Sequence, residues 1–211
     1  MLVSLLLCFV LAQAAEVSAS QSSPPQGDVV KPRSRAEEKW TLDYRPGALR
    51  LWRDPKSGEQ YWFATFTIAN RTGKDRRVAP QWDMLDDSGR LSKSGAGVSS
   101  DVTREIMRLL NDPQLLETSG VIGMIAQGEE NAKSGLVVFQ AGPEERKFAL
   151  LVSGLSSERT SIKHPQSGEP VTVRKTFRMD FQVPGERSAF RGEVPLATPE
   201  PGVGNPSWIM R

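Results

Sequence analysis

The 211-residue sequence has little of what metal centres and disulfides are made from. It contains one cysteine, Cys8, and one histidine, His164. A disulfide needs two cysteines, and a zinc site usually takes several thiolate or imidazole ligands. We therefore predict that the protein folds without a disulfide, a metal ion or another cofactor.

A catalytic triad is also missing from the pattern. His164 would have to supply the imidazole, and it stands in IKHPQSGEP, a turn-like segment typical of a solvated loop. The serines nearest to it do not lie in a Gly-x-Ser-x-Gly nucleophile context; they are Ser153, Ser156 and Ser157. The sequence predicts no catalytic, cofactor-binding or metal-binding residue.

Long apolar runs are absent beyond the first residues. Residues 2–11 are almost all apolar, and Ala12-Gln13-Ala14 forms an A-x-A cleavage pattern. A run this short suits a signal peptide better than a bilayer span, which needs about 20 residues. We predict a signal peptide over residues 1–14, with cleavage as late as residue 19, and a secreted or periplasmic protein without a membrane span after cleavage. An uncleaved anchor is the alternative.

Neither sign of charge is in large excess. The chain has 27 Lys and Arg residues against 25 Asp and Glu residues, which gives a formal net charge of +2. A balance this close provides no strong electrostatic attraction for nucleic acid. We predict that nucleic acid is not a partner.

The composition divides the rest of the chain into three parts. Residues 15–37 include a Ser/Pro/Gln-rich stretch without apolar periodicity and are predicted to be a disordered leader. Residues 188–211 form a Pro/Gly-rich tail, although Trp208-Ile209-Met210 could pack against another element. The folded domain is predicted over residues 38–187.

Alternation of period two dominates this domain. Residues 171–183 place apolar side chains on one face and polar ones on the other, which predicts a strand with one buried face. Lys175 interrupts the apolar face, which predicts a bulge or a rim position where its ammonium reaches water. Thirteen residues would span roughly 43 Å at ~3.3 Å each, which is long for one strand, so we expect a break there. Further strands are predicted around residues 40–44, 49–53, 61–69, 78–86, 135–139 and 147–154.

One segment has a helical period instead. Apolar residues recur at helical spacing between residues 99 and 118; they are Val102, Ile106, Leu109 and Leu110. Ser99, Ser100 or Asp101 can cap the start, and Asn111-Asp112-Pro113 can end the helix. We predict that this helical insertion covers an open end of the sheets. A surface that binds a partner or lipid is the alternative.

The order of strands and turns carries a resemblance. YWFATFTIAN precedes a charged turn and a strand that ends in WDMLDDSG, and IAQGEENAKSGLVVF and KFALLVSG follow. This order resembles a family of bacterial secreted and lipoprotein domains of unknown function with a telokin-like, immunoglobulin-type β-sandwich. The positions that match the turn and strand motifs of that family are Asn70, Asp86, Gly89, Gly128, Glu129, Gly135 and Phe139. The resemblance covers about residues 60–153 and implies a fold rather than an activity.

Three groups of side chains could carry chemistry. Asp83, Asp86 and Asp87 lie close in sequence, but Asp86-Asp87-Ser88-Gly89 is also ordinary turn chemistry. The basic run 74–77, with Arg71 just before it, could bind phosphate or an acidic polymer, but Asp75 interrupts it and a solvated loop is favoured. The glycines of GVIGMIAQG lack dinucleotide-loop spacing.

These observations predict an all-β fold, an immunoglobulin-like antiparallel β-sandwich with one short helical insertion. The preferred function is a non-catalytic binding or structural module of the cell envelope, with an envelope protein or polymer as partner. The alternative is a hydrolase of envelope carbohydrate or peptide that uses Asp83, Asp86 or Glu129–Glu130 as its carboxylates.

Overall fold

Strands dominate the computed structural model, which describes residues 38–142, 146–185, 190, 192–199 and 204–211. The expected signal peptide (1–14) and leader (15–37) lie outside the described residues. The first sheet has the order β1 (Asp43–Arg53), β2 (Gln60–Asn70), β8 (Gly128–Gln140) and β6 (Leu116–Glu117). The second sheet has the order β10 (Arg159–Lys163), β11 (Pro170–Gln182), β9 (Lys147–Ser153), β4 (Gln81–Asp86) and β5 (Leu91–Lys93), and β12 (Ser207–Met210) also pairs with β11.

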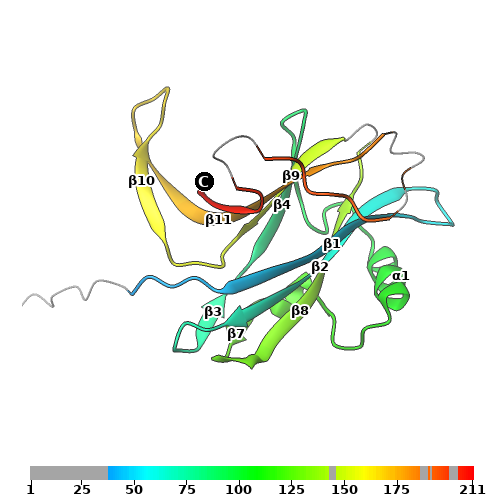
Figure 1. Cartoon of the computed structure of the whole chain (residues 1–211), viewed down its shortest axis with the longest axis horizontal. Coiled ribbons are helices and arrows are strands. Elements are labelled where there is room, and N and C mark those ends of the chain that lie inside the picture. Colours follow the sequence, from blue (N-terminus) through cyan, green and yellow to red (C-terminus); the bar gives the residue numbers. More distant parts are fainter. Residues whose placement is uncertain (1–37, 143–145, 186–189, 191, 200–203) are drawn as a thin grey trace, which may run out of the picture. The chain divides into compact units, whose positions relative to one another are not determined.

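The predicted all-β sandwich with a short helix is confirmed (Figure 1). Neighbouring strands are antiparallel except for the short pair of β6 and β8, which is parallel. A separate two-stranded ribbon joins β3 (Arg76–Val78) to β7 (Gly123–Ile125). The helices are α1 (Ser100–Leu110) and the four-residue α2 (Thr118–Val121), and no described helix is long and apolar enough to cross a membrane.

Aromatic side chains from both sheets make the centre of the core. Phe66 of β2 lies with its ring centroid 4.5 Å from that of Trp82 of β4, and Trp62 of β2 lies 5.1 Å from Phe148 of β9. Phe66, Trp82, Trp62 and Phe148 are all buried. Contacts of this kind stabilise a pair by about 0.5–1.5 kcal/mol beyond the burial of its area, so these rings hold the two sheets together.

Two predicted strand regions differ from the strands in the structure. The register of β1 against β2 shifts between Pro46 and Leu49, where a side chain on Gly47 would meet the backbone oxygen of Thr65 at 2.9 Å. The sequence predicted two strands here, and the structure has one strand with an irregularity. The strand predicted over 78–86 is divided at Ala79–Pro80 instead, so that β3 joins the ribbon and β4 joins the second sheet.

The helix α1 covers a sheet face, and the prediction that it covers an open end of the sandwich is wrong. Val102 and Ile106 are buried in one cluster with Tyr61 and Phe63, which lie on the face of β2 that points away from the main core. The prediction for Leu109 is also wrong, because its side chain is 63% exposed. Ser99 caps the helix as expected, since its hydroxyl accepts a hydrogen bond from the backbone N–H of Val102.

The strand β11 runs unbroken through Lys175, so the expected break in this strand is wrong. Phe177 of β11 pairs with Val152 of β9, and Arg174 of β11 pairs with Arg159 of β10. Two residues of β11 therefore lie opposite the six residues 153–158. The irregularity lies in the segment opposite β11, where Leu155 and Ser157 turn aside and form backbone hydrogen bonds with Leu42 and Trp40. The carbonyl of Glu158 then accepts a hydrogen bond from the backbone N–H of Lys175, so the pairing with β11 resumes there.

The Pro/Gly-rich tail belongs to the domain beyond the expected boundary at residue 187. Residues 38–211 form one compact unit, in which β12 pairs with β11 and Val194 is buried in the core. Trp208 packs its ring 5.1 Å from that of Phe177. The described part of the tail thus completes the second sheet.

Candidate functional site

Asp86 is occupied by the turn that it begins. One carboxylate oxygen accepts hydrogen bonds from the backbone N–H and hydroxyl of Ser88 and from the backbone N–H of Arg90, and the other accepts from the Arg90 guanidinium at 2.9 Å. Gly89 has a φ of 83°. Burial alone would raise the pKa of Asp86, but the hydrogen bonds from Ser88 and Arg90 outweigh it and lower the pKa.

Asp83 and Glu129, two further acids of the hydrolase hypothesis, also have structural partners. Asp83 of β4 accepts a hydrogen bond from the Arg211 guanidinium at 3.3 Å. Glu129 is paired with Arg45 and with Arg71, the latter at 2.8 Å, and the hydrogen bond from Arg45 is the main reason that its pKa is lowered. Within the part of the chain that the structure describes, no cluster of three or more His, Cys, Asp or Glu residues is arranged to hold a metal ion.

Lys74 and Arg76 of the basic run 74–77 are held by neighbouring side chains. Lys74 lies 2.9 Å from Glu38. The Arg76 guanidinium stacks 5.2 Å from the ring centre of Trp40, and its Nε donates to the hydroxyl of Thr72. Asp75, which interrupts the run, accepts a hydrogen bond from the backbone N–H of Gln127. These contacts hold the β2–β3 turn against its neighbours.

His164 is at the tip of the hairpin formed by β10 and β11. Its Nδ1 accepts hydrogen bonds from the backbone N–H groups of Gln166 and Ser167, and its own backbone N–H and carbonyl close the turn with Glu169 and Gly168. Gly168 has a φ of 72°, which favours glycine. The histidine therefore organises the turn rather than only lying in solvent.

A cationic surface that sequence analysis did not single out lies on this hairpin. Arg159 of β10 and Arg174 of β11 are directly opposite each other, and both are exposed. At the next position along β11, the backbone N–H of Lys175 donates a hydrogen bond to the carbonyl of Glu158. Arg159 and Arg174 are thus a non-hydrogen-bonded pair, the type in which side chains lie closest. Among the described residues, neither guanidinium has a hydrogen-bond or ion-pair partner.

A third arginine extends the pair across the sheet. Arg211 and Arg174 exchange two backbone hydrogen bonds, of 2.7 and 3.0 Å, on the opposite edge of β11. Arg159, Arg174 and Arg211 therefore share one face of three adjacent chain segments, and we call them the arginine row. The backbone oxygen of Arg211 accepts from the N–H of Arg174, while the Arg211 guanidinium reaches across this face to Asp83.

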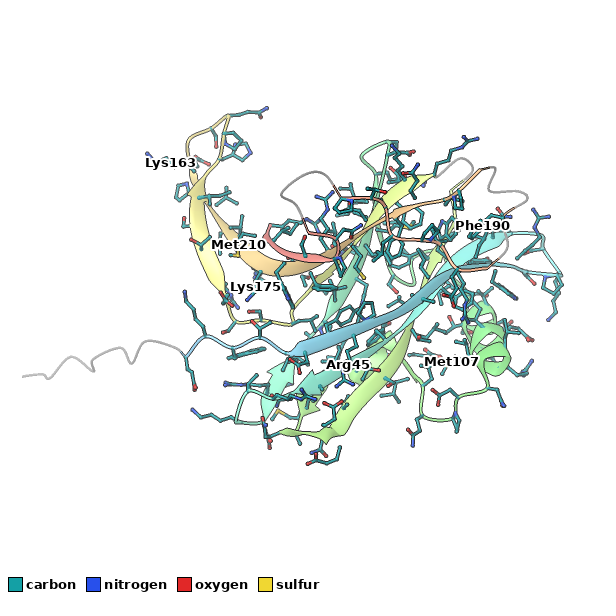
Figure 2. All side chains as sticks on the ribbon, viewed as in Figure 1. Arg45, Met107, Lys163, Lys175, Phe190 and Met210 are labelled. Atoms are coloured by element: carbon teal, nitrogen blue, oxygen red, sulfur yellow. The ribbon has the colours of Figure 1, made fainter. Side chains whose placement is uncertain are left out.

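The arginine row lies on the face of the second sheet that points away from the aromatic core, which we call the outer face. The strand registers place seven basic and two acidic side chains on it among the described residues of the strands and Arg211. They are Lys93, Lys147, Arg159, Lys163, Arg174, Arg178 and Arg211, and Asp83 and Asp180. The hairpin brings Lys163 to the end far from the core (Figure 2).

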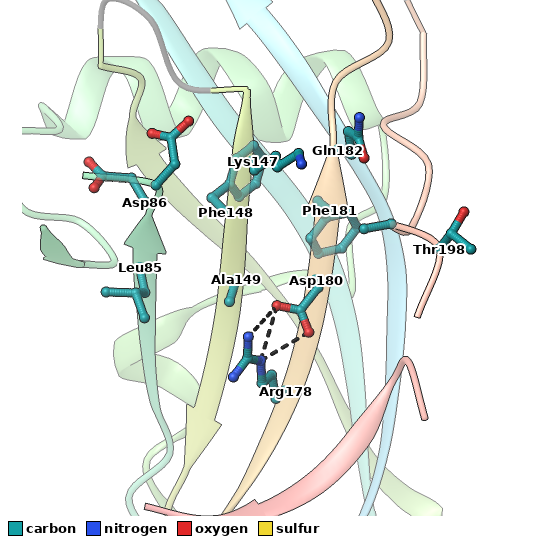
Figure 3. Close-up of a pocket in the computed structure, with 12 residues that line it drawn as sticks. Leu85, Asp86, Lys147, Phe148, Ala149, Arg178, Asp180, Phe181, Gln182 and Thr198 are labelled. Carbon is teal, nitrogen blue, oxygen red and sulfur yellow. Dashed lines mark hydrogen bonds and ion pairs between the residues drawn. The ribbon is translucent and has the colours of Figure 1, made fainter. Parts of the chain in front are cut away.

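Two shallow depressions adjoin Arg178 on this face. One of about 270 Å³ is lined by Lys147, Arg178 and Asp180 among others (Figure 3), and one of about 350 Å³ by Arg178, Asp180 and Asn205 among others. The Arg178 guanidinium forms hydrogen bonds of 2.8–3.0 Å with Asp180. The side chain of Asn205 fixes the tail beside them through bonds to both backbone groups of Asp180.

No family model, curated protein or solved structure matches this chain in the comparisons with known proteins.

Proposed function

We propose that the protein is a non-catalytic binding module and that the outer face of the β10–β11 hairpin is its binding surface. The observation that carries the proposal is the pair Arg159 and Arg174, two exposed guanidiniums held opposite each other without an anionic partner among the described residues. Like charges opposite one another in a sheet are destabilising. A binding role gives a reason for the repulsion, because an anionic ligand relieves it.

The alternative, a carboxylate-dependent hydrolase, has less support. A general acid in such an enzyme needs a raised pKa. Asp86 and Glu129 instead have lowered pKa values, each caused by bonds to cations or turn donors, and Asp83 is engaged by Arg211. These acids are committed to the structure of turns and sheets.

We further propose that the protein acts outside the cytoplasm, in the cell envelope. This rests on the signal-peptide pattern of residues 1–14 and on the turn motifs that resemble the telokin-like envelope domains. An envelope protein or polymer is the class of partner that this location supplies.

Retention of envelope material on the immobilised protein tests the binding role. Proteins, lipids and polymers of the envelope fraction are passed over wild type and over the variant Arg159→Gln/Arg174→Gln, and the retained material is identified and sized. Material that wild type retains with its length unchanged, and that the variant does not retain, supports the proposal. No retention above bare beads, or release of shortened material that Asp83→Asn abolishes, would overturn it.

A further inference from the structure

From the outer face we infer the class of ligand: a linear polymer with repeating oxyanion groups, laid along β11 and across the arginine row. The inference rests on the proposed binding role and adds the chemistry of the partner. Guanidinium groups match phosphate, sulfate and carboxylate oxygens through paired N–H donors. A ligand of this class would supply the anions that Arg159 and Arg174 lack.

The spacing of the cations fits a chain better than a single anion. Neighbouring segments of the row are about 4.8 Å apart in a sheet, so Arg159, Arg174 and Arg211 extend over roughly 10 Å. Arg178 follows Arg174 at four residues along β11, which adds about 13 Å in the perpendicular direction. A single small oxyanion cannot contact all of these groups, whereas successive charges of one chain can.

The charge distribution also explains why the overall balance gave no sign of such a ligand. The whole chain has a formal net charge of +2, while the strand residues of the outer face together with Arg211 have five more basic than acidic side chains, seven against two. Both acids on this face are already paired, Asp83 with Arg211 and Asp180 with Arg178. The basic excess is therefore local and available to a ligand.

Nucleic acid and an anionic bilayer are less well matched. Proteins that bind single strands stack the bases on aromatic side chains, and the described strand residues of the outer face include no aromatic. The exposed apolar pair of the hairpin, Ile162 and Val171, faces the opposite way, because each lies one residue out of phase with the arginines. A bilayer that met the arginines would not take up this pair.

The test measures binding of defined polymers to the full-length protein. The probes are inorganic polyphosphate, dextran sulfate and polygalacturonate, which separate phosphate, sulfate and carboxylate, with single-stranded DNA and phosphatidylglycerol vesicles as the competing classes. The variant Arg159→Gln/Arg174→Gln removes the opposed pair. The matched control Arg104→Gln/Arg108→Gln removes two exposed arginines from α1, where each is paired with an acid. Thermal melts confirm that both variants fold.

We expect at least one polymer to bind with an affinity that falls as salt rises, as for other polyelectrolytes. The opposed-pair variant should lose at least tenfold in affinity and reduce the salt slope by about one for each arginine, while the control stays within about twofold of wild type. Equal losses in variant and control, or tighter binding of DNA or vesicles than of every polymer, would overturn the inference.

A failure of this inference is distinguishable from a failure of the binding role. Envelope material retained equally by wild type and by Arg159→Gln/Arg174→Gln would overturn the oxyanion-polymer assignment and leave a binding module with a different surface. No retained envelope material would overturn the binding role itself.

Discussion

The side-chain amide of Asn70 donates a hydrogen bond of 2.8 Å to the backbone carbonyl of Ile125, and so joins the end of β2 to β7. The same amide nitrogen donates to the carbonyl of Lys74, and the amide oxygen accepts from the backbone N–H and hydroxyl of Thr72. Asn70 is fully buried. Its residue type is therefore fixed by geometry, since both its donors and its acceptor are used.

Replacing Asn70 by alanine should destabilise the protein by about 2–3 kcal/mol, because buried carbonyls and an N–H lose their partner. Urea denaturation measures the change. Asn131→Ala is the control, since Asn131 is exposed and donates to the backbone carbonyl of Gln127, and it should stay within about 0.5 kcal/mol of wild type. Equal effects of the two substitutions would show that the Asn70 network is not structural.

The helix α1 gives a sharper contrast within one element. Ile106→Ala should lower the free energy of unfolding by about 2–5 kcal/mol, because the side chain is fully buried. Leu109→Ala, three residues on, should change it by less than about 0.5 kcal/mol, because Leu109 is mostly exposed. Both midpoints come from the same urea series, and a large loss in Leu109→Ala would mean that the helix docks through another face.

The opposed arginines predict that replacing one of them by an acid stabilises the unliganded protein. Arg159→Glu should stabilise the unliganded protein by about 0.2–1 kcal/mol, because it replaces a repulsive cross-strand pair by an attractive one. The gain should shrink in 1 M salt, where the screening length is about 3 Å. Thermal melts at low and high salt check this, and stability that falls at both salt concentrations would contradict the proposed repulsion.

Low pH should destabilise the protein, because the folded state keeps certain carboxylates ionised. The pKa of Asp86 is lowered by hydrogen bonds that outweigh its burial, and the pKa of Glu158 is lowered chiefly by its hydrogen bond from Lys175. A lowered folded-state pKa contributes stability above the ordinary values, 3.8 and 4.5, and this contribution is lost as pH falls below them. Unfolding free energies measured between pH 7 and pH 2 should therefore be level at first and fall below about pH 4.5. A flatter acid limb is expected for Asp86→Asn, and no difference from wild type would contradict the assignment.

Removal of divalent metal should leave the fold unchanged. The oxygens of Asp86 are taken up by Ser88 and Arg90, and Asp83 by Arg211. Thermal melts with and without a chelator should superimpose. A fall of more than a few degrees in the chelated sample would reassign these aspartates as metal ligands.

Alternation in the sequence predicted most of the strands, because a strand with one buried face has an apolar residue at every second position. It could not predict where β11 meets its neighbours. The detour lies within residues 153–158, whose turn-like sequence does not reveal that Leu155 and Ser157 leave the sheet and bond with Leu42 and Trp40. Lys175 itself pairs with Glu158 at 2.5 Å and does not simply extend into water.

Helical spacing likewise predicted α1 but not its orientation. Apolar residues stand both three and four positions after Ile106, so the sequence does not determine which side of the helix packs against the sheet. The contacts follow the four-residue series Val102, Ile106 and half-buried Leu110, and Leu109 is left exposed. The arginine row was out of reach for a different reason. Its members come from three distant segments, so their proximity depends on strand register and on the path of the tail.

The detour at residues 153–158 also has a consequence for the order of folding. The backbone of Trp40 is bonded to Ser157, 117 positions later, and Arg50 is paired with Glu193, 143 positions later. Contacts this distant in sequence slow folding. At about 5–20 residues per second, the ribosome needs roughly 6 to 23 s to make the chain between Trp40 and Ser157. During this interval β1 can already pair with β2, whereas the contact between Trp40 and Ser157 can form only after Ser157 has been made.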